Sequence, residues 1–274
     1  MKYCRFQFDS QIHYGAVEVR DSEPWIVDLT PAPEEDLAFR LEHGRATSWG
    51  FDFEPMPLSA ADLLPPVTPS KIICVGRNYR DHAKELGNEV PAEPLLFFKP
   101  PSSLLKPGGI VRLPAASARV DFEGELALVI GRRVRNLKPD SNWREAIRGY
   151  TLANDITARD LQKREAQWTR AKGFDTFCPV GPIVSDELDP QVGLTIETRV
   201  NGVLRQQGST LDFLFRIPEL LQYITAAMTL EPGDLILTGT PASVGPLAPC
   251  DRVEVSIPGL GVLSNSVQPE ELRS

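Results

Sequence analysis

The chain has 274 residues, of which 42% are hydrophobic and 24% charged, and it carries a formal net charge of −8. This composition is ordinary for a globular protein with a substantial core, and the acidic charge argues against binding to nucleic acid or anionic membranes through electrostatics. No apolar run is long enough for a transmembrane helix, and the N-terminus lacks an apolar signal core, so a cytoplasmic protein is expected.

The N-terminal segment is predicted to begin with a small β-unit. Apolar residues alternate with polar ones over residues 3–29, and Asp21 marks a turn within this stretch. A short helix is expected to begin at Pro33, with acidic residues in its first turn, and to end near Gly44. The segment therefore combines strands with one helix.

A cluster of prolines separates this segment from the rest of the chain. Five prolines fall within residues 55–69, and such a density indicates a semi-rigid connector. We therefore predict a small α/β domain over residues 1–69 and a larger domain over residues 70–274.

The larger domain is predicted to consist mostly of strands. Its apolar runs predict strands over 71–75, 95–99, 110–113, 120–130, 150–156, 194–200, 203–205, 235–238 and 253–255. The dipeptide Asn201-Gly202 suits a type I′ turn and indicates a hairpin. Because helices do not alternate regularly with strands, the pattern favours an α+β fold, mostly β, over a doubly wound parallel sheet.

A few helices are expected between these strands. A short helix carries His82 and is ended by Gly87, and a second covers residues 142–148. Thr157 is expected to cap a third helix over residues 158–168. A fourth covers residues 217–228, where leucines recur at helical spacing after a proline.

The sharpest chemical feature is a row of acids in the strand over residues 120–130. Side chains alternate along a strand, so Asp121, Glu123 and Glu125 share one face, with about 7 Å between successive carboxylates. Gly124 removes a side chain and allows another group to approach the backbone. The row is either an exposed acidic face or the ligand set of a divalent cation.

Asp155 strengthens the metal interpretation. It ends a different predicted strand, so it can join Glu123 and Glu125 from a neighbouring position. Carboxylate oxygens suit Mg²⁺, Mn²⁺ or Ca²⁺ better than zinc or copper, and the chain has no CxxC pair. Asp121 is either a fourth ligand or the partner of an arginine.

Other side chains are candidates for acid–base chemistry and anion binding. His82 and Glu85 lie three residues apart on a helix, so the acid can orient the imidazole as a general base, although His82 can also be a structural histidine. Arg77 and Lys99 can hold a carboxylate, and Lys172 follows a helix in a glycine-containing loop. The alternative for each of these cations is a solvated surface charge.

Six motifs together resemble those of the fumarylacetoacetate hydrolase family. They occur in the same order as in the family and extend over about 200 residues. They are Val75-Gly76-Arg77-Asn78-Tyr79 with His82, Phe98-Lys99-Pro100, Asp121-Phe122-Glu123-Gly124-Glu125-Leu126, Asn154-Asp155-Ile156-Thr157-Ala158-Arg159-Asp160, Lys172 with Phe174-Asp175-Thr176, and Gly239-Thr240-Pro241. The N-terminal 70 residues resemble the small extra domain of bacterial members. The resemblance implies a mixed β-roll catalytic domain that assembles as a homodimer.

The resemblance also implies a role for each site residue. Mg²⁺ or Mn²⁺, with Ca²⁺ as a substitute, is expected on Glu123, Glu125 and Asp155. His82 with Glu85 would form an acid–base dyad on a segment that closes over substrate. The remaining expected site residues are Lys172, a catalytic residue, and Arg77, Gln162 and Thr240, which contact substrate. The further aspartate ligand of animal fumarylacetoacetases has no match in this sequence, which leaves three carboxylates, as in bacterial acylpyruvase-like members.

The expected activity follows from the family chemistry. The leading prediction is a metal-dependent hydrolase that cleaves a C–C bond in acylpyruvate or fumarylpyruvate-type 1,3-diketo acids through a metal-stabilised enolate. The alternatives are an isomerase, tautomerase or decarboxylase of 2-hydroxy-dienedioates or oxaloacetate, in aromatic catabolism. From another class, the chain can be a non-catalytic, metal-stabilised domain that binds a small acid. In each case the partner is a small oxo or hydroxy carboxylic acid.

Overall fold

The structure is a computed structural model that describes residues 1–271 except 22, 34–52 and 88. Within these residues the strands form a twelve-stranded, a five-stranded and a three-stranded sheet. Almost all neighbouring strands are antiparallel; the pairs β14–β8, β17–β6 and β20–β9 are parallel. This arrangement, with few helices, confirms the predicted mostly-β α+β fold and the absence of a doubly wound parallel sheet.

The large sheet runs in the order β4-β3-β2-β1-β14-β12-β11-β17-β6-β7, with β5 paired to β1 and β8 to β14. Its strands are β1 (Lys2–Phe8), β2 (Gln11–Arg20), β3 (Glu23–Leu29), β4 (Met56–Pro57), β5 (Asp62–Leu64), β6 (Ile72–Gly76), β7 (Leu95–Lys99), β8 (Leu104–Leu105), β11 (Gly124–Ile130), β12 (Ile147–Asn154), β14 (Cys178–Ser185) and β17 (Leu235–Leu237). The central strands β11, β12 and β14 are buried on both faces, and they carry the site described below.

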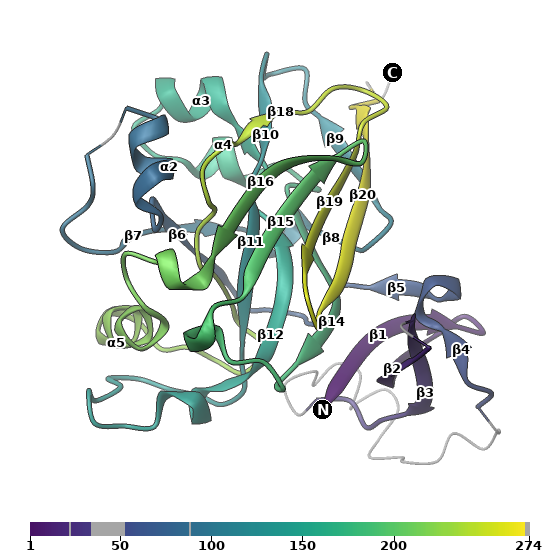
Figure 1. The fold of residues 1–274 in the computed structure, drawn as a ribbon. Helices are drawn as coiled ribbons and strands as arrows, with labels where there is room; N and C mark the ends of the chain where they lie inside the picture. Colours follow the sequence, from purple (N-terminus) through teal and green to yellow (C-terminus); the bar gives the residue numbers. More distant parts are fainter. Residues whose placement is uncertain (22, 34–52, 88, 272–274) are drawn as a thin grey trace.

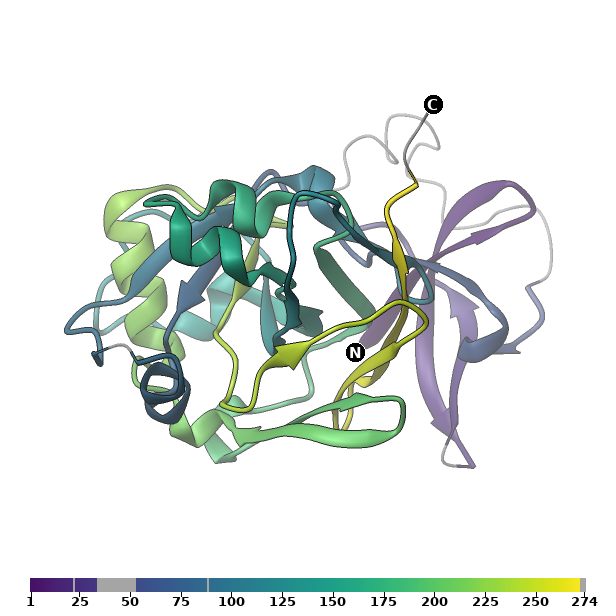
Figure 2. The same ribbon diagram turned by 90° about the horizontal axis from the view of Figure 1, so that it is seen from above.

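The N-terminal β-unit is present as predicted, in strands β1, β2 and β3. These strands, with β4 and β5, lie to one side of the molecule in both ribbon views (Figures 1 and 2). Lys2 and Tyr3 of β1 pair with Ser185 and Val184 of β14, so the backbone ladder continues from this unit into the central sheet. The helix expected after Pro33 lies outside the described residues. The division at residues 69 and 70 stays a prediction.

The other two sheets complete the core. The five-stranded sheet contains β9 (Ile110–Leu113), β15 (Thr195–Val200), β16 (Val203–Ser209), β19 (Arg252–Ile257) and β20 (Gly261–Pro269); the three-stranded sheet contains β10 (Val120–Phe122), β13 (Thr157–Ala158) and β18 (Gly245–Pro246). Between β15 and β16, Asn201 and Gly202 have φ of 53° and 77°, which confirms the predicted hairpin. Apolar residues of β11 and β12 pack against those of β15 and β19 in one core.

The helices are short and lie around the sheets (Figure 1). The α-helices are α2 (Arg80–Glu85), α3 (Arg159–Arg164), α4 (Thr169–Gly173) and α5 (Ile217–Ala227), and the 3₁₀ turns are η1 (Leu58–Ala60), η2 (Pro101–Ser103), η3 (Trp143–Ala146), η4 (Pro190–Val192) and η5 (Thr210–Asp212). None of the helices in the described part of the chain has the length and apolarity needed to cross a membrane. Gly87, at φ 69°, follows α2 as predicted.

Two helix predictions were wrong in extent. Residues 142–148 form only the 3₁₀ turn η3, because Ile147 already belongs to β12. The helix expected over residues 158–168 begins at Arg159 and ends at Arg164, since Thr157 and Ala158 pair with β10 as strand β13. The Thr157 hydroxyl donates to the Asp155 carbonyl at 2.9 Å instead of capping the helix.

The strand predicted over residues 120–130 is interrupted at Glu123. Val120–Phe122 pairs with β13 and β18, whereas Gly124–Ile130 pairs with β12 and β17 in the large sheet. At the break, the Glu123 N–H donates to Asn154 Oδ1 at 2.9 Å and the Glu123 carbonyl accepts from the Asp155 N–H at 2.8 Å. The chain therefore passes from one sheet to another at the first residue of the Glu-Gly-Glu motif.

Gly124 is required by the packing of the two sheets. A Cβ atom at this position would lie 2.1 Å from Thr198 Oγ1 on β15, so this is the close approach that the sequence anticipated. Gly124→Ala should therefore lower the free energy of unfolding by about 1–3 kcal/mol, the usual cost of overpacking, as measured by urea denaturation.

The double variant Gly124→Ala/Thr198→Ala tests that cause. It should recover part of the lost stability, because the clashing oxygen is removed. Thr198→Ala alone should stay near wild type, since its buried hydroxyl has no hydrogen-bond partner among the described residues. If the double variant is no more stable than Gly124→Ala, the clash is not the cause.

Candidate active site

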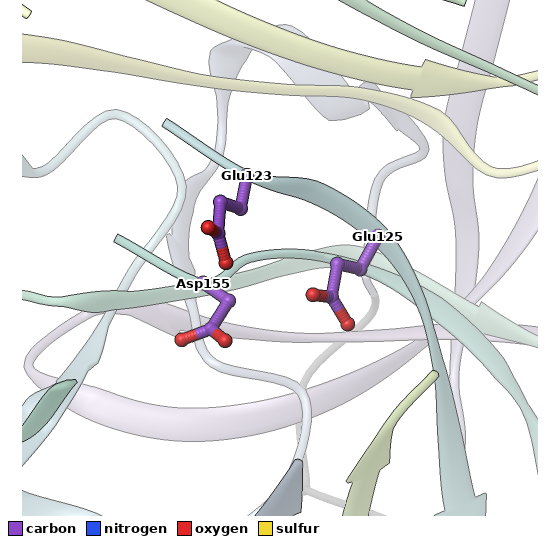
Figure 3. A group of neighbouring side chains, drawn as sticks. All are labelled: Glu123, Glu125 and Asp155. Carbon is purple, nitrogen blue, oxygen red and sulfur yellow. The ribbon is translucent and has the colours of Figure 1, made fainter. Parts of the chain in front are cut away.

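Three buried carboxylates from neighbouring strands converge at the centre of the molecule. Glu123 precedes β11, Glu125 lies within it, and Asp155 directly follows β12 (Figure 3). One oxygen of each lies within 4.8 Å of the others, and each residue is at most 4% exposed. β11 and β12 pair in register, with Gly124 opposite Asn154, which fixes Asp155 beside the Glu-Gly-Glu motif.

Two buried lysines compensate part of this negative charge. Lys172 Nζ donates to Glu123 Oε2 at 2.7 Å and to Asp155 Oδ2 at 2.6 Å. Lys99 Nζ donates to Asp155 Oδ1 at 2.7 Å and to the Ile156 carbonyl at 3.1 Å. Burial lowers the pKa of Lys172, but the charges of Asp155 and Glu123 outweigh it and raise that pKa to about 12. Lys172 lies on the short helix α4 and not in the predicted loop.

Asp121 belongs to a different cluster. It accepts from Arg119 Nε and Nη2 at 2.8 and 3.1 Å, and from Arg159 Nε at 2.9 Å. Of the two roles that the sequence left open for Asp121, the structure shows pairing with arginines. Arg159 also donates to Glu123 Oε1 at 2.5 Å and to Gln162 Oε1 at 2.6 Å, so one buried guanidinium joins three predicted site positions.

The pKa values of Glu123 and Glu125 are shifted in opposite directions. Burial raises the pKa of Glu123, but Lys172 and Arg159 outweigh it and hold the pKa well below its usual range. Burial raises the pKa of Glu125 well above its usual range, and the negative charges of Asp155 and Glu123 act in the same direction. Glu125 is therefore the least compensated acid of the three.

The surroundings of Glu125 fit a hard divalent cation. Its Oε2 accepts from the Gly239 N–H at 2.6 Å, and no basic side chain of the described residues forms an ion pair with it. Leaving a buried carboxylate without a counter-charge is costly, whereas a divalent ion would supply the missing positive charge. The donor set contains only carboxylate oxygens, the ligands that Mg²⁺ and Mn²⁺ prefer.

His82 and Glu85 lie side by side on α2. His82 Nδ1 is 3.4 Å from Glu85 Oε2, a contact longer than an ordinary hydrogen bond. Glu85 also accepts from the Ser243 N–H through both oxygens, at 3.0 and 2.9 Å. Burial lowers the pKa of His82; the charge of Glu123 and the contact with Glu85 act against this effect without cancelling it.

The predicted residues share one cavity of about 300 Å³. It is lined by Val75, Gly76, Arg77, His82, Leu86, Phe97, Glu123, Glu125, Asp155, Arg159, Gln162, Lys163, Trp168, Lys172 and Thr240. The nine predicted site residues are thus brought together with one exception, since Glu85 does not line the cavity and reaches it only through His82. The cavity wall adds Phe97, Trp168, Lys163 and Arg159, which the sequence analysis did not select.

Gln206 is a buried residue that sequence reasoning missed. It lies on β16, one residue beyond the strand predicted over residues 203–205, and nothing in the local sequence marked it as a site residue. Its Oε1 accepts from the Gly124 N–H at 3.1 Å, and its Nε2 donates to Thr240 Oγ1 at 2.9 Å and to the Pro241 carbonyl at 2.8 Å. Thr240 Oγ1 in turn donates to the Gly124 carbonyl at 2.9 Å. Gln206 therefore connects the backbone of the Glu-Gly-Glu motif to the loop at Thr240 and Pro241, of which Thr240 lines the cavity.

A known protein family and a known relative each match most of this chain. The family described as fumarylacetoacetate (FAA) hydrolase C-terminal matches residues 71–268. The oxaloacetate tautomerase YisK of Bacillus subtilis is 43% identical over 224 residues, which cover 77% of this chain and 74% of that protein.

Two solved structures are similar over nearly the whole chain. A 2-hydroxyhepta-2,4-diene-1,7-dioate isomerase from Mycobacterium marinum has 37% identity and a TM-score of 0.82, with 99% of this chain and 100% of that one covered. A fumarylacetoacetate hydrolase from Exiguobacterium antarcticum has 38% identity and a TM-score of 0.79, with 98% and 100% covered. Their names span an isomerase and a hydrolase on one fold.

Glu125 and Asp121 are both buried acids, and variants of the two can distinguish a metal ligand from an acid that only pairs with arginines. Glu125→Gln should lose the thermal stabilisation that Mn²⁺ gives the wild type, because a ligand carboxylate is removed. Asp121→Asn should be less stable but should keep the Mn²⁺-dependent rise in melting temperature. A metal at 100 times its Kd adds about 2.7 kcal/mol to the free energy of unfolding, so calorimetric melting with and without Mn²⁺ will show it. Equal Mn²⁺ responses in the two variants would contradict the assignment of Glu125.

Proposed function

The chain belongs to the fumarylacetoacetate hydrolase family, and from this membership we propose that it is a divalent-metal-dependent enzyme that moves a proton on an oxaloacetate-type 2-oxo dicarboxylic acid. The reaction would interconvert the keto and enol forms. The observation that carries the proposal is one cavity that is lined both by three buried carboxylates and by a buried histidine. Similarity to an oxaloacetate tautomerase and to a 2-hydroxy-dienedioate isomerase supports proton transfer over hydrolysis.

The carboxylates Glu123, Glu125 and Asp155 would hold Mg²⁺ or Mn²⁺, with Ca²⁺ as a substitute. When bound, the ion supplies a Lewis acid for the 2-oxo group of the substrate. Lys172 holds Glu123 and Asp155 in position through its two hydrogen bonds. Lys99 fixes the second oxygen of Asp155 from the far side.

His82 is the proposed proton carrier. Its lowered pKa keeps the imidazole neutral near pH 7, so it can accept a proton from the carbon beside the 2-oxo group. Glu85, held by the Ser243 N–H, would orient the ring and stabilise it once protonated. Lys172 brings positive charge to the cavity, where negative charge would develop on the substrate oxygen.

The charge of the cavity favours a doubly negative substrate. Four permanently positive side chains and three acids line it, before any cation is added. Arg77, Gln162 and Thr240 are the proposed contacts for substrate oxygens. Thr240 Oγ1 already donates to the Gly124 carbonyl and accepts from Gln206 Nε2, so the group of Thr240 that would donate to a substrate oxygen is its backbone N–H.

C–C bond hydrolysis, the leading prediction from the sequence, is the second candidate. The similar structure of a fumarylacetoacetate hydrolase keeps it open. Hydrolysis, isomerisation and decarboxylation can start from the same stabilised enolate and differ in whether water or a proton reaches it or CO₂ leaves. The homodimer, the cytoplasmic location and a role in aromatic catabolism also stay predictions.

The test is a direct assay of enol–keto interconversion. Purified protein with Mg²⁺ should accelerate the loss of the enol absorbance of oxaloacetate, and EDTA should abolish the effect. His82→Ala should lower the rate by about 10²–10⁴-fold, the usual contribution of a general base, while Mg²⁺ binding persists. Full turnover in His82→Ala with Mg²⁺ bound would refute the dyad.

Product analysis separates the candidate reactions. The same incubations should be examined for pyruvate and CO₂ release, and parallel ones with acylpyruvates and fumarylpyruvate for cleavage products. Release of CO₂ at the rate of enol loss identifies a decarboxylase, and faster cleavage of a 1,3-diketo acid identifies the hydrolase. Tight Mg²⁺-dependent binding of these acids without any turnover identifies the non-catalytic binding domain.

The pH dependence of kcat/KM follows from the direction in which the pKa of His82 is shifted. His82 must be neutral to accept a proton, and burial holds its pKa below the ordinary 6.5. The acid limb of kcat/KM should therefore fall below pH 6.5. The Glu85 carboxylate raises the pKa of His82, so Glu85→Gln should move the limb to still lower pH.

The matched control is Asp81→Asn, on the same helix with an 83% exposed side chain, which should leave the pH profile unchanged. An acid limb at or above pH 6.5, or an upward shift in Glu85→Gln, would contradict the assignment of His82.

A further inference from the structure

Two cations that line the cavity have no acidic partner among the described residues. The Arg77 guanidinium and the Lys163 ammonium form no ion pair with any described residue, in contrast to Lys172 and Arg159, which are bound to the carboxylates of the site. Arg77 is half-buried and Lys163 is exposed. Cations without a carboxylate that face a ligand cavity are available for an anionic ligand.

Helix α3 explains why Lys163 reaches this cavity. Arg159, Gln162 and Lys163 are spaced by three and four residues, so they share one helix face. Arg159 and Gln162 hydrogen-bond to each other beneath the cavity. The next residue, Arg164, does not line the cavity and pairs with Glu165 instead.

Trp168 holds Arg77 in place. The guanidinium carbon lies 5.9 Å from the Trp168 ring, within cation–π range. Phe97 meets the same indole edge-on, with centroids 5.3 Å apart, and Lys172 Nζ lies 4.9 Å from the Phe97 ring. A Cβ atom on Gly76 would come within 3.1 Å of the indole, so the ring lies closely against the strand that leads to Arg77.

Phe97 and Trp168 each lie against one cation of the cavity, and the two cations differ in whether they are already bound to an acid. Lys172, on Phe97, is bound to Glu123 and Asp155 and belongs to the acidic end of the cavity. Arg77, which lies against Trp168, forms no ion pair with any described acid. A substrate whose 2-oxo acid end lies at the carboxylates would find, among the cations that line the cavity, only Arg77 and Lys163 without an ion pair in the described residues.

We propose that Lys163, together with Arg77 positioned by Trp168, binds the second carboxylate of the substrate and so selects dicarboxylic over monocarboxylic 2-oxo acids. This inference rests on the proposed function for the location of the reacting end. Lys163 contacts the substrate directly. Trp168 is a positioning residue that acts through Arg77.

Equilibrium binding tests this selection independently of turnover. In the Mg²⁺-loaded His82→Ala protein, calorimetry should give a lower Kd for oxaloacetate than for 2-oxobutanoate, which has a methyl group in place of the second carboxylate. Adding Lys163→Met should raise the Kd for oxaloacetate about 10–100-fold, the usual effect of losing a charged hydrogen bond, and leave 2-oxobutanoate unchanged. Arg164→Met, on the same helix, is the matched control and should change neither Kd.

Trp168 requires a second pair of variants. Trp168→Leu should raise the KM for oxaloacetate with little change in kcat, because Arg77 loses its support while the acidic end stays intact. Trp168→Phe should restore most of the affinity, since a cation–π face remains.

The outcomes distinguish this inference from the proposed function. If the His82→Ala protein binds both acids equally, or if adding Lys163→Met weakens both by the same factor, the second-carboxylate subsite is wrong even where the wild type shows turnover. If the wild type turns over neither acid but prefers the dicarboxylate and loses that preference in Lys163→Met, the subsite stands and the proposed reaction falls.

Discussion

The structure depends on compensating three carboxylates that are buried within a few ångströms of one another. Lys172 bridges Glu123 and Asp155, and Lys99 takes the other oxygen of Asp155. Neither reaches Glu125, whose hydrogen bond from the Gly239 N–H supplies only a partial positive charge. A fully buried charge without a partner is destabilising, so the incomplete compensation at Glu125 is the physical basis for expecting a cation there.

The fold makes this cluster possible by bringing together two points at which the chain passes between the large and the three-stranded sheet. The chain changes sheets at Glu123, and β12 ends at Asn154, whose side chain accepts from the Glu123 N–H. Gly124 lies between them and leaves room for Thr198 of the facing sheet. From the same sheet, Gln206 hydrogen-bonds to Gly124 and to the Thr240 loop. The acids are thus held by backbone and amide contacts, in addition to the lysines.

The division of labour within the cavity explains how one fold can support several reactions. The acidic end and His82 line the same cavity, and in the proposed function they would support the enolate chemistry that hydrolysis, isomerisation and decarboxylation share. Trp168 and Lys163 line the same cavity but form no hydrogen bond or ion pair with its carboxylates in the described part of the chain. Changes there can alter the substrate without disturbing the carboxylate cluster, which is consistent with relatives that carry different activity names on similar structures.

Much of the fold followed from the sequence alone. The alternating runs predicted the N-terminal strands and the hairpin at Asn201-Gly202, because side-chain period and turn chemistry are local properties. The Glu-Gly-Glu motif and Asp155 predicted an acidic cluster, and the motif order predicted the family and its mostly-β fold. These features depend on residues close in the chain or on a recognised pattern.

Only the tertiary structure decided which partner each charge takes. Asp121 pairs with Arg119 and Arg159, although its spacing matches that of the two glutamates in the cluster, because the chain leaves one sheet and enters another at Glu123. Arg159 and Gln206 reach the site from a helix and a hairpin far along the chain, and no local period reports such contacts. Hydrophobic pattern fixes which face of an element is buried; long-range pairing of strands decides which buried charges meet.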